Sequence, residues 1–151
     1  MAGRHFEDFV QGMKSTLGPI AVTEPVLIEF ARKYDPQPIH VDPVAAGKGP
    51  FGGLIASGWH TASLVMRVLV DSYLPRDAQL ASPGIDELRW LRPVRPGDSL
   101  GVTVTVLEAR RSQSKPDRGL VRTGIEAVNQ NGDIVMSLIA MNLFRCRREA
   151  E

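Results

Sequence analysis

Residues 57–73 read SGWHTASLVMRVLVDSY and decide how the rest of the chain must be arranged. Apolar or small side chains recur there at steps of three and four residues, at Trp59, Ala62, Ser63, Met66, Val70 and Tyr73. Only Arg67 and Asp71 are charged, and their four-residue spacing predicts an ion pair on one exposed strip. Because the other faces are apolar, we predict a core helix that other elements surround.

The residues before this helix are predicted to form a second helix, a single helical turn and a loop. Thr23 is placed to cap a helix that ends at Tyr34, because the next residue precedes a proline and is disfavoured in the α region. The Asp42-Pro43 pair predicts one helical turn over residues 44–46. Four glycines and Pro50 predict a loop with unusual backbone angles over residues 47–53.

The residues after the long helix are typical of an antiparallel sheet. Leu100 to Val106 alternate apolar and small or polar side chains, and Asn131-Gly132 is a strong hairpin signal. We predict strands over residues 20–22, 85–92, 100–106, 120–129 and 134–144, a polar loop over 75–84, and a frayed polar tail over 145–151. The last strand is apolar on both faces and is therefore expected inside the sheet. Together these elements predict an α+β fold in which an antiparallel sheet wraps around a long central helix.

Composition limits the function classes. The chain has 151 residues, 43% of them hydrophobic, and a formal net charge of +1, so we expect one domain spanning residues 1–151. This charge balance provides no basic surface for nucleic acid or for an anionic membrane. Residues 49–66 carry no charge but contain four glycines, which argues against a membrane span. A single cysteine, Cys146, and charged N-terminal residues favour a cytoplasmic location without an export segment.

The segment Asp35-Pro36-Gln37-Pro38-Ile39-His40 is the stiffest loop in the chain, because its two prolines restrict their own backbone and that of the preceding residues. Such a loop can direct Asp35 and His40 into one cleft, where a carboxylate and an imidazole hold one water between them. A structural interpretation stays open beside the catalytic one. In that interpretation Asp35 only ends a helix and His40 only forms a hydrogen bond within the loop.

Residues 34–42, YDPQPIHVD, resemble the hydratase-2 motif of the MaoC-like dehydratases, a family that includes the (R)-specific enoyl-CoA hydratases. Three further segments are similar to that family, namely Phe6 to Gly12 at its opening, Phe51 to Gly58 before its central helix, and Pro93 to Asp98 between two strands. Tyr34, Gln37 and Ser57 stand where the family more often has Gly, Asn and His.

The resemblance implies the hot-dog fold and the interconversion of a trans-2-enoyl-CoA and an (R)-3-hydroxyacyl-CoA. Asp35 and His40 match the family's catalytic aspartate and histidine, with Asp35 expected as the main base and His40 as the group that orients the water. The resemblance also implies a homodimer or a higher oligomer, an acyl-CoA substrate and no cofactor beyond the CoA of that substrate.

Gly58 is the candidate donor to the thioester oxygen, because an N–H in the first turn of a helix has no intrahelical partner and the helix dipole favours negative charge there. The alternative is that Gly58 only permits close packing. Ser57, Trp59 and Ser63 are candidate substrate-binding residues, with capping and core packing as the alternatives. His60 is expected to be a satisfied core histidine. The three histidines show no metal-ligand spacing, so we predict no metal.

Two other functions remain compatible with these residues. A hot-dog acyl-CoA thioesterase would use the Asp35 carboxylate to direct water at the thioester carbonyl instead of at C3. A non-catalytic acyl-CoA-binding subunit is favoured by Gln37 and Ser57, where the family often has Asn and His. Hydrolysis releases free thiol, hydration removes the enoyl absorbance without it, and a binding subunit does neither.

Overall fold

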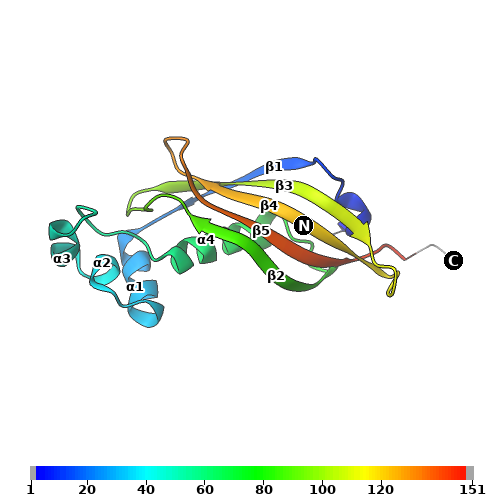
Figure 1. Cartoon of the computed structure of the whole chain (residues 1–151), viewed down its shortest axis with the longest axis horizontal. Helices are drawn as coiled ribbons and strands as arrows, with labels where there is room; N and C mark the ends of the chain where they lie inside the picture. Colours follow the sequence, from blue (N-terminus) through cyan, green and yellow to red (C-terminus); the bar gives the residue numbers. More distant parts are fainter. Residues whose placement is uncertain (1–2, 149–151) are drawn as a thin grey trace.

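Five antiparallel strands form one sheet in the order β1-β3-β4-β5-β2, and a long helix, α4, lies against one face of that sheet (Figure 1). The computed structural model describes residues 3–148. The strands are β1 (Lys14–Ala21), β2 (Gln79–Trp90), β3 (Ser99–Arg111), β4 (Arg118–Val128) and β5 (Ile134–Arg145). The helices are the 3-10 turn η1 (Phe6–Asp8), α1 (Glu24–Tyr34), α2 (Pro38–Val41), α3 (Pro43–Lys48) and α4 (Gly58–Ser72). The predicted α+β class and the predicted sheet around a long helix are confirmed.

Every second side chain along the strands points into the core between the sheet and α4. On β3, the side chains of Leu100, Val102 and Val104 are at most 1% exposed, as the alternation in the sequence predicts. They belong to the same apolar cluster as Val65 and other residues of α4. The predicted hairpin at Asn131-Gly132 joins β4 to β5, and the turn needs a glycine because Gly132 has a φ of +83°.

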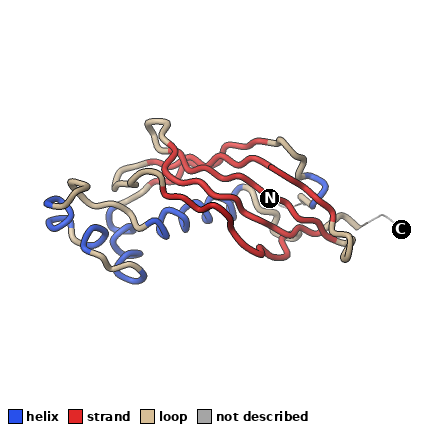
Figure 2. The backbone as a smooth tube through the Cα atoms, viewed as in Figure 1, coloured by secondary structure: helices blue, strands red, loops and turns tan. Residues whose placement is uncertain are grey.

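The long helix α4 is buried on one side only. Val65, Val68 and Leu69 face the core, whereas Trp59 and Met66 are 59% and 48% exposed. The apolar side of α4 that carries Trp59 and Met66 is therefore not buried within this chain, because the single sheet covers only one face of the helix (Figure 2). The predicted ion pair is confirmed by a distance of 2.8 Å between Arg67 Nε and Asp71 Oδ2. Within residues 3–148, no helix is both long and apolar enough to cross a membrane.

Two strand boundaries differ from the sequence predictions. β1 spans Lys14–Ala21 and pairs with β3, so the predicted strand over residues 20–22 was too short and too late. β2 begins at Gln79, inside the segment predicted as a polar loop. Its backbone pairs with β5, and Ser82 donates a hydrogen bond to the Met141 carbonyl at 2.6 Å. Pairing through the backbone does not require apolar side chains at an edge, which is why side-chain periodicity missed this half of the strand.

Three short helices lie beyond one end of the sheet, at the entrance to α4 (Figure 2). The helix predicted after Thr23 is confirmed as α1, although the Thr23 side chain makes no capping hydrogen bond. Asp42 caps α3 by accepting from two backbone N–H groups at 3.0 and 3.1 Å. Residues 38–41 form the helical turn α2 where a loop was predicted, because a proline at the first helical position is already set for helix.

The C-terminal residues 145–147 are held by hydrogen bonds. The backbone N–H of Cys146 donates to the Asp117 carbonyl at 2.8 Å, and Arg147 Nη2 lies 2.6 Å from both carboxylate oxygens of Asp8. The expectation of a frayed tail is therefore wrong for residues 145–147, since these residues make long-range contacts that a local sequence pattern cannot show. Residues 149–151 of that predicted tail lie outside the described residues.

Candidate active site

Asp35 and His40 meet at the junction of α1 and α2. Asp35 follows the last residue of α1, where its N–H donates to the Ala31 carbonyl at 2.8 Å, and His40 lies within α2. The distance between Asp35 Oδ2 and His40 Nε2 is 3.3 Å. The prolines between them turn the chain so that residues five positions apart face each other, which a continuous helix would not permit.

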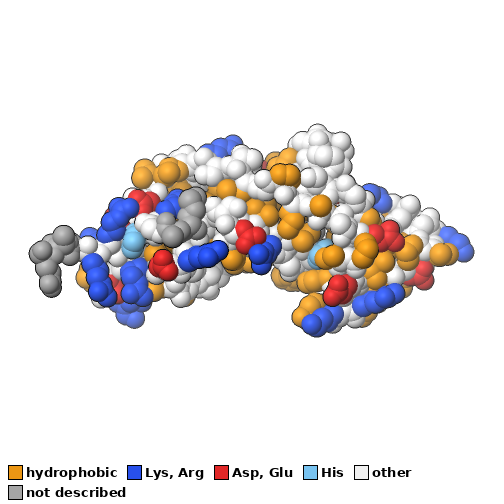
Figure 3. Space-filling model, turned by 180° about the vertical axis from the view of Figure 1, so that it is seen from behind, with side chains coloured by type: hydrophobic (Ala, Val, Ile, Leu, Met, Phe, Trp, Pro, Cys, Tyr) orange, Lys and Arg blue, Asp and Glu red, His pale blue; other side chains and the backbone are white. Residues whose placement is uncertain are grey.

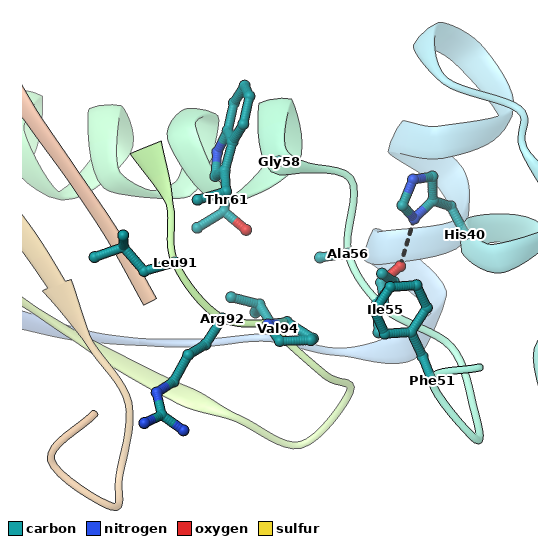
Figure 4. Close-up of a pocket in the computed structure, with 11 residues that line it drawn as sticks. His40, Phe51, Ile55, Ala56, Gly58, Thr61, Leu91, Arg92 and Val94 are labelled. Atoms are coloured by element: carbon teal, nitrogen blue, oxygen red, sulfur yellow. Dashed lines mark hydrogen bonds between the residues drawn. The ribbon is translucent and has the colours of Figure 1, made fainter. Parts of the chain in front are cut away.

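The hydrogen bonds around the pair define what each ring nitrogen can do. His40 Nδ1 lies 2.7 Å from the Ile55 carbonyl oxygen, and a carbonyl only accepts, so Nδ1 carries the proton (Figure 4). In a neutral imidazole, Nε2 then presents a lone pair toward Asp35. At 3.3 Å the two atoms leave no room for a molecule between them, but a water lying beside the pair can donate one proton to each.

The Asp35 carboxylate is held in its ionised form. Gln37 Nε2 donates to Asp35 Oδ1 at 2.6 Å, and this hydrogen bond is the main reason that the pKa of Asp35 lies below the usual aspartate value. A hydrogen bond from the nearby Ser57 hydroxyl lowers that pKa further, and so does the His40 ring in its protonated form. The Ser57 hydroxyl is fully buried and lies beside the Asp35 carboxylate.

Gly58 begins α4 and is covered by an indole. A Cβ atom at this position would lie 2.4 Å from Trp90 Cε2, so no larger residue fits unless Trp90 moves. This close approach explains why the position is glycine, as the packing alternative predicts. The backbone N–H of Gly58 is among the first in α4 and has no carbonyl one turn earlier to bind, so it remains a candidate donor to an oxyanion.

A cavity of about 270 Å³ connects His40 with the start of α4 (Figure 4). It is lined by His40, Phe51, Ile55, Ala56, Gly58, Thr61, Trp90, Leu91, Arg92, Pro93 and Val94. Asp35 does not line this cavity, but its Oδ2 lies 3.3 Å from Nε2 of His40, which does. Sequence reasoning did not identify Phe51 or residues 90–92 as lining residues. Two consecutive large apolar residues at the end of a strand, Trp90 and Leu91, could have indicated that this segment lines a cavity.

The predicted substrate-binding residues fall into two places. Ser57 lies beside Asp35, whereas Trp59 and Ser63 line a second cavity of about 330 Å³ between α4 and the sheet. The rings of Trp59 and Trp90 meet edge to face at 78°, with centroids 5.1 Å apart. Trp90 lines the first cavity and Trp59 the second, so this aromatic pair lies between the two. Ser63 Oγ already donates to the Trp59 carbonyl at 2.7 Å, an ordinary contact within a helix.

His60 is a core residue, but it is not fully satisfied. Its side chain is buried against the Phe30 ring at a centroid distance of 5.0 Å, and its Nε2 has no hydrogen-bond partner among the described residues. Burial lowers the pKa of His60 and keeps the imidazole neutral. Across residues 3–148, no three His, Cys, Asp or Glu side chains are grouped in a way that would hold a metal ion.

Sequence relatives of this chain include named dehydratases. Residues 9–129 match the family profile described as the MaoC like domain. A 3-hydroxybutyryl-CoA dehydratase of Methylorubrum extorquens is 33% identical over 109 residues, which are 69% of this chain and 64% of that protein. The 3-hydroxyacyl-thioester dehydratase Z of Mycobacterium tuberculosis is 32% identical over 93 residues, 61% of this chain and 62% of that protein.

Solved structures agree with the sequence match. A MaoC-like dehydratase from Rhodospirillum rubrum has a TM-score of 0.90 and 40% identity, and the alignment covers 97% of this chain and all of that one. The R-hydratase PhaJ1 from Pseudomonas aeruginosa has a TM-score of 0.74 and 27% identity, with coverage of 97% and 92%. These neighbours confirm the predicted hot-dog fold. Because the family profile covers most of its length, the chain belongs to the MaoC-like dehydratase family.

Proposed function

We propose that this protein is a hydratase that interconverts a trans-2-enoyl-CoA and an (R)-3-hydroxyacyl-CoA. The observation that carries the proposal is the 3.3 Å distance between Asp35 Oδ2 and His40 Nε2, with His40 Nδ1 2.7 Å from the Ile55 carbonyl oxygen. This geometry suits one water molecule that donates a proton to each of them. The named dehydratase relatives and the R-hydratase neighbour support the same reaction class.

In the hydration direction, the water bound beside Asp35 and His40 attacks C3 of the enoyl group. Its oxygen forms the new C3–O bond, one proton passes to the Asp35–His40 pair, and the double-bond electrons move toward the thioester oxygen. The N–H of Gly58 stabilises the oxygen as it becomes enolate-like. The pair then returns a proton to C2 on the same face, so that the elements of water add in a syn manner. No cofactor beyond the substrate's CoA takes part.

A second copy of the chain is part of the proposal. β2 is an edge strand, and its Ile85 and Trp90 are 56% and 44% exposed. The exposed side of α4 adds further apolar side chains, and Figure 3 shows hydrophobic groups gathered along this face of the molecule. An edge with an adjoining apolar surface of this kind is usually covered by a partner. We place the dimer in the cytoplasm, where the single thiol of Cys146 stays reduced.

The test measures loss of the enoyl absorbance and release of free thiol with crotonyl-CoA and longer trans-2-enoyl-CoA esters. Asp35→Asn is expected to reduce turnover by roughly a hundred- to ten-thousand-fold, because it removes the general base. The matched control is Asp71→Asn, which alters an exposed aspartate paired with Arg67 on α4 and should retain activity.

Each alternative function predicts a different result in the same assay. Free thiol released by the wild-type protein would indicate a thioesterase. Binding of acyl-CoA without any turnover would indicate a non-catalytic subunit. Unchanged hydration in Asp35→Asn would refute the role of this carboxylate.

A further inference from the structure

The outer face of the sheet, on the side away from α4, is covered by no helix within residues 3–148 (Figure 1). Along β4, the residues that point to this face alternate with the buried ones, and they include Arg122, Gly124 and Glu126. A cavity of about 300 Å³ hollows the same face, and Gly124, Glu126 and Ile139 are among its lining residues. The sheet therefore has a hollow on a face that no other element of the described chain fills.

Gly124, in the middle of this face, is a glycine that the fold of one chain does not require. It pairs in register with Thr105 on β3 and with Ile139 on β5, and its φ is not positive. A Cβ atom at this position would meet Leu107 at 3.5 Å, which is ordinary van der Waals contact. A glycine inside a strand weakens that strand, and it can mark a place where another backbone or a ligand approaches closely. Because the described chain leaves room for a side chain here, the approaching group belongs to another molecule.

The charges on the two sides of Gly124 are opposite. Arg122 lies two residues before Gly124 on the same face of β4, and Glu126 lies two residues after it, each roughly 7 Å away along the strand. Within residues 3–148, the partly exposed Glu126 carboxylate forms no ion pair, and Arg122 has only a 3.7 Å contact with Glu108. This face therefore presents a cation and an anion, equally spaced about a glycine, that can pair with charges from outside the chain.

A second copy of the chain supplies both of the missing charges. A two-fold axis through Gly124, perpendicular to the sheet, places Arg122 opposite the partner's Glu126 and Glu126 opposite the partner's Arg122. Sheets that pack face to face lie about 10 Å apart, which an arginine and a glutamate together can span. The same axis places Leu107 opposite the partner's Ile139, so apolar side chains meet beside the two glycines. The surface is thus complementary to itself in charge and in side-chain type.

We propose that the outer faces of two sheets pair about Gly124, which doubles the assembly that the α4 side forms. The contact is rich in polar groups, so it forms at high protein concentration, whereas the dilute protein keeps the assembly of the α4 side. This inference goes beyond the proposed function, because it concerns the face of the sheet away from α4 and does not involve Asp35 or His40.

Sedimentation velocity between about 1 μM and about 1 mM protein measures the pairing, and we expect the mass of the wild-type assembly to double over this range. Gly124→Ala should keep the melting temperature, since alanine fits beside Leu107 and suits a strand better than glycine does. The same variant should weaken the doubling about tenfold, because the added methyl group holds the two backbones apart. A constant wild-type mass, or a Gly124→Ala protein that doubles as readily as the wild type, would overturn the inference.

Two charge reversals and their mixture test the two-fold pairing. Glu126→Arg and Arg122→Glu each place like charges opposite each other in a self-pair, so neither variant alone should double. In an equimolar mixture, the arginines of one variant face the glutamates of the other, and doubling should return. The neighbours of Glu126 in register, Thr103 and Ser137, are uncharged, whereas Arg122 lies beside Glu108, so circular dichroism checks the fold of each variant. A mixture of folded variants that does not double would contradict the pairing.

The matched control is Glu29→Arg on α1, which makes the same change of charge at an exposed glutamate away from the sheet. This variant should double as the wild type does, and loss of doubling here would show a general effect of charge that contradicts the specific contact. The enoyl-CoA assay on the dilute protein separates this inference from the proposed function. Hydration without doubling would refute only the sheet pairing, and doubling without hydration would refute only the hydratase.

Discussion

Individual side chains at the Asp35–His40 pair are oriented by neighbours that take no part in the proposed reaction. The Ile55 carbonyl sets which nitrogen of His40 carries the proton, and the Gln37 amide donates to the carboxylate at 2.6 Å. The amide of Gln37 thus occupies one carboxylate oxygen and leaves Oδ2 for the water. A residue that departs from the usual family motif is therefore compatible with an ionised base.

Gln37→Leu should raise the pKa of Asp35 toward its usual value, because the largest interaction that lowers this pKa is lost. Carbon-13 NMR titration of the Asp35 carboxyl group measures this shift directly. The stability difference between the wild-type protein and the variant should be fully present above the usual aspartate pKa. It should disappear as the pH falls through the lowered value in the folded protein. An unchanged titration would show that Gln37 does not hold the carboxylate.

At the level of elements, the contact between the start of α4 and the end of β2 shapes the site. Trp90, the last residue of β2, covers Gly58 and lines the cavity that contains His40. On its other side, Trp90 packs against Trp59. One strand end therefore forms a wall of the reacting centre and the boundary with the second cavity.

Gly58→Ala should destabilise the fold by about 1–3 kcal/mol, the usual cost of overpacking, because its Cβ would overlap the Trp90 ring. Urea denaturation of a double-mutant cycle with Trp90→Ala tests the cause. The Gly58→Ala substitution should cost much less when Trp90 is already truncated, since the overlapping ring is then absent. Equal costs in both backgrounds would mean that the backbone of α4, and not the indole, requires glycine.

The molecule as a whole leaves one apolar side uncovered. A single sheet buries one face of α4, and the opposite face carries Trp59, Met66 and Val70 beside the edge strand β2. The mouth of the second cavity opens on this same side, at Trp59, Met66 and Ile85. A second copy that covers this surface would also close the mouth of that cavity from water.

Val70→Glu should shift the protein from dimer to monomer, because a charge would be buried where the two copies meet. Sedimentation velocity measures the change, and the enoyl-CoA assay should show reduced turnover in the same variant. The matched control is Val26→Glu on α1, which replaces a valine of similar exposure, 48% against 43% for Val70, and should remain dimeric. A wild-type protein that sediments as a monomer would contradict the proposed assembly.

The sequence by itself determined the features that depend on neighbouring residues. The apolar period of residues 57–73 specified α4, the alternation at residues 100–106 specified part of β3, and the prolines around Gln37 brought Asp35 and His40 together. Each of these follows from backbone restriction or side-chain periodicity within a short segment, which is why local reasoning succeeded. The same reasoning failed at residues 79–84, where pairing with β5 and not side-chain pattern forms the strand.

Only the tertiary structure decided which distant residues share a site. Trp90 covers Gly58, and Tyr73 and Thr123 line one cavity, although each pair lies far apart in the chain and no local pattern connects its members. Arg67 and Asp71 marked one exposed strip of α4, but only the structure showed that the apolar side chains of Trp59 and Met66 are exposed as well. The physical reason is that the burial of a side chain depends on which surfaces of the helices and the sheet pack together. The register and twist of the whole sheet determine that packing, and no short segment contains this information.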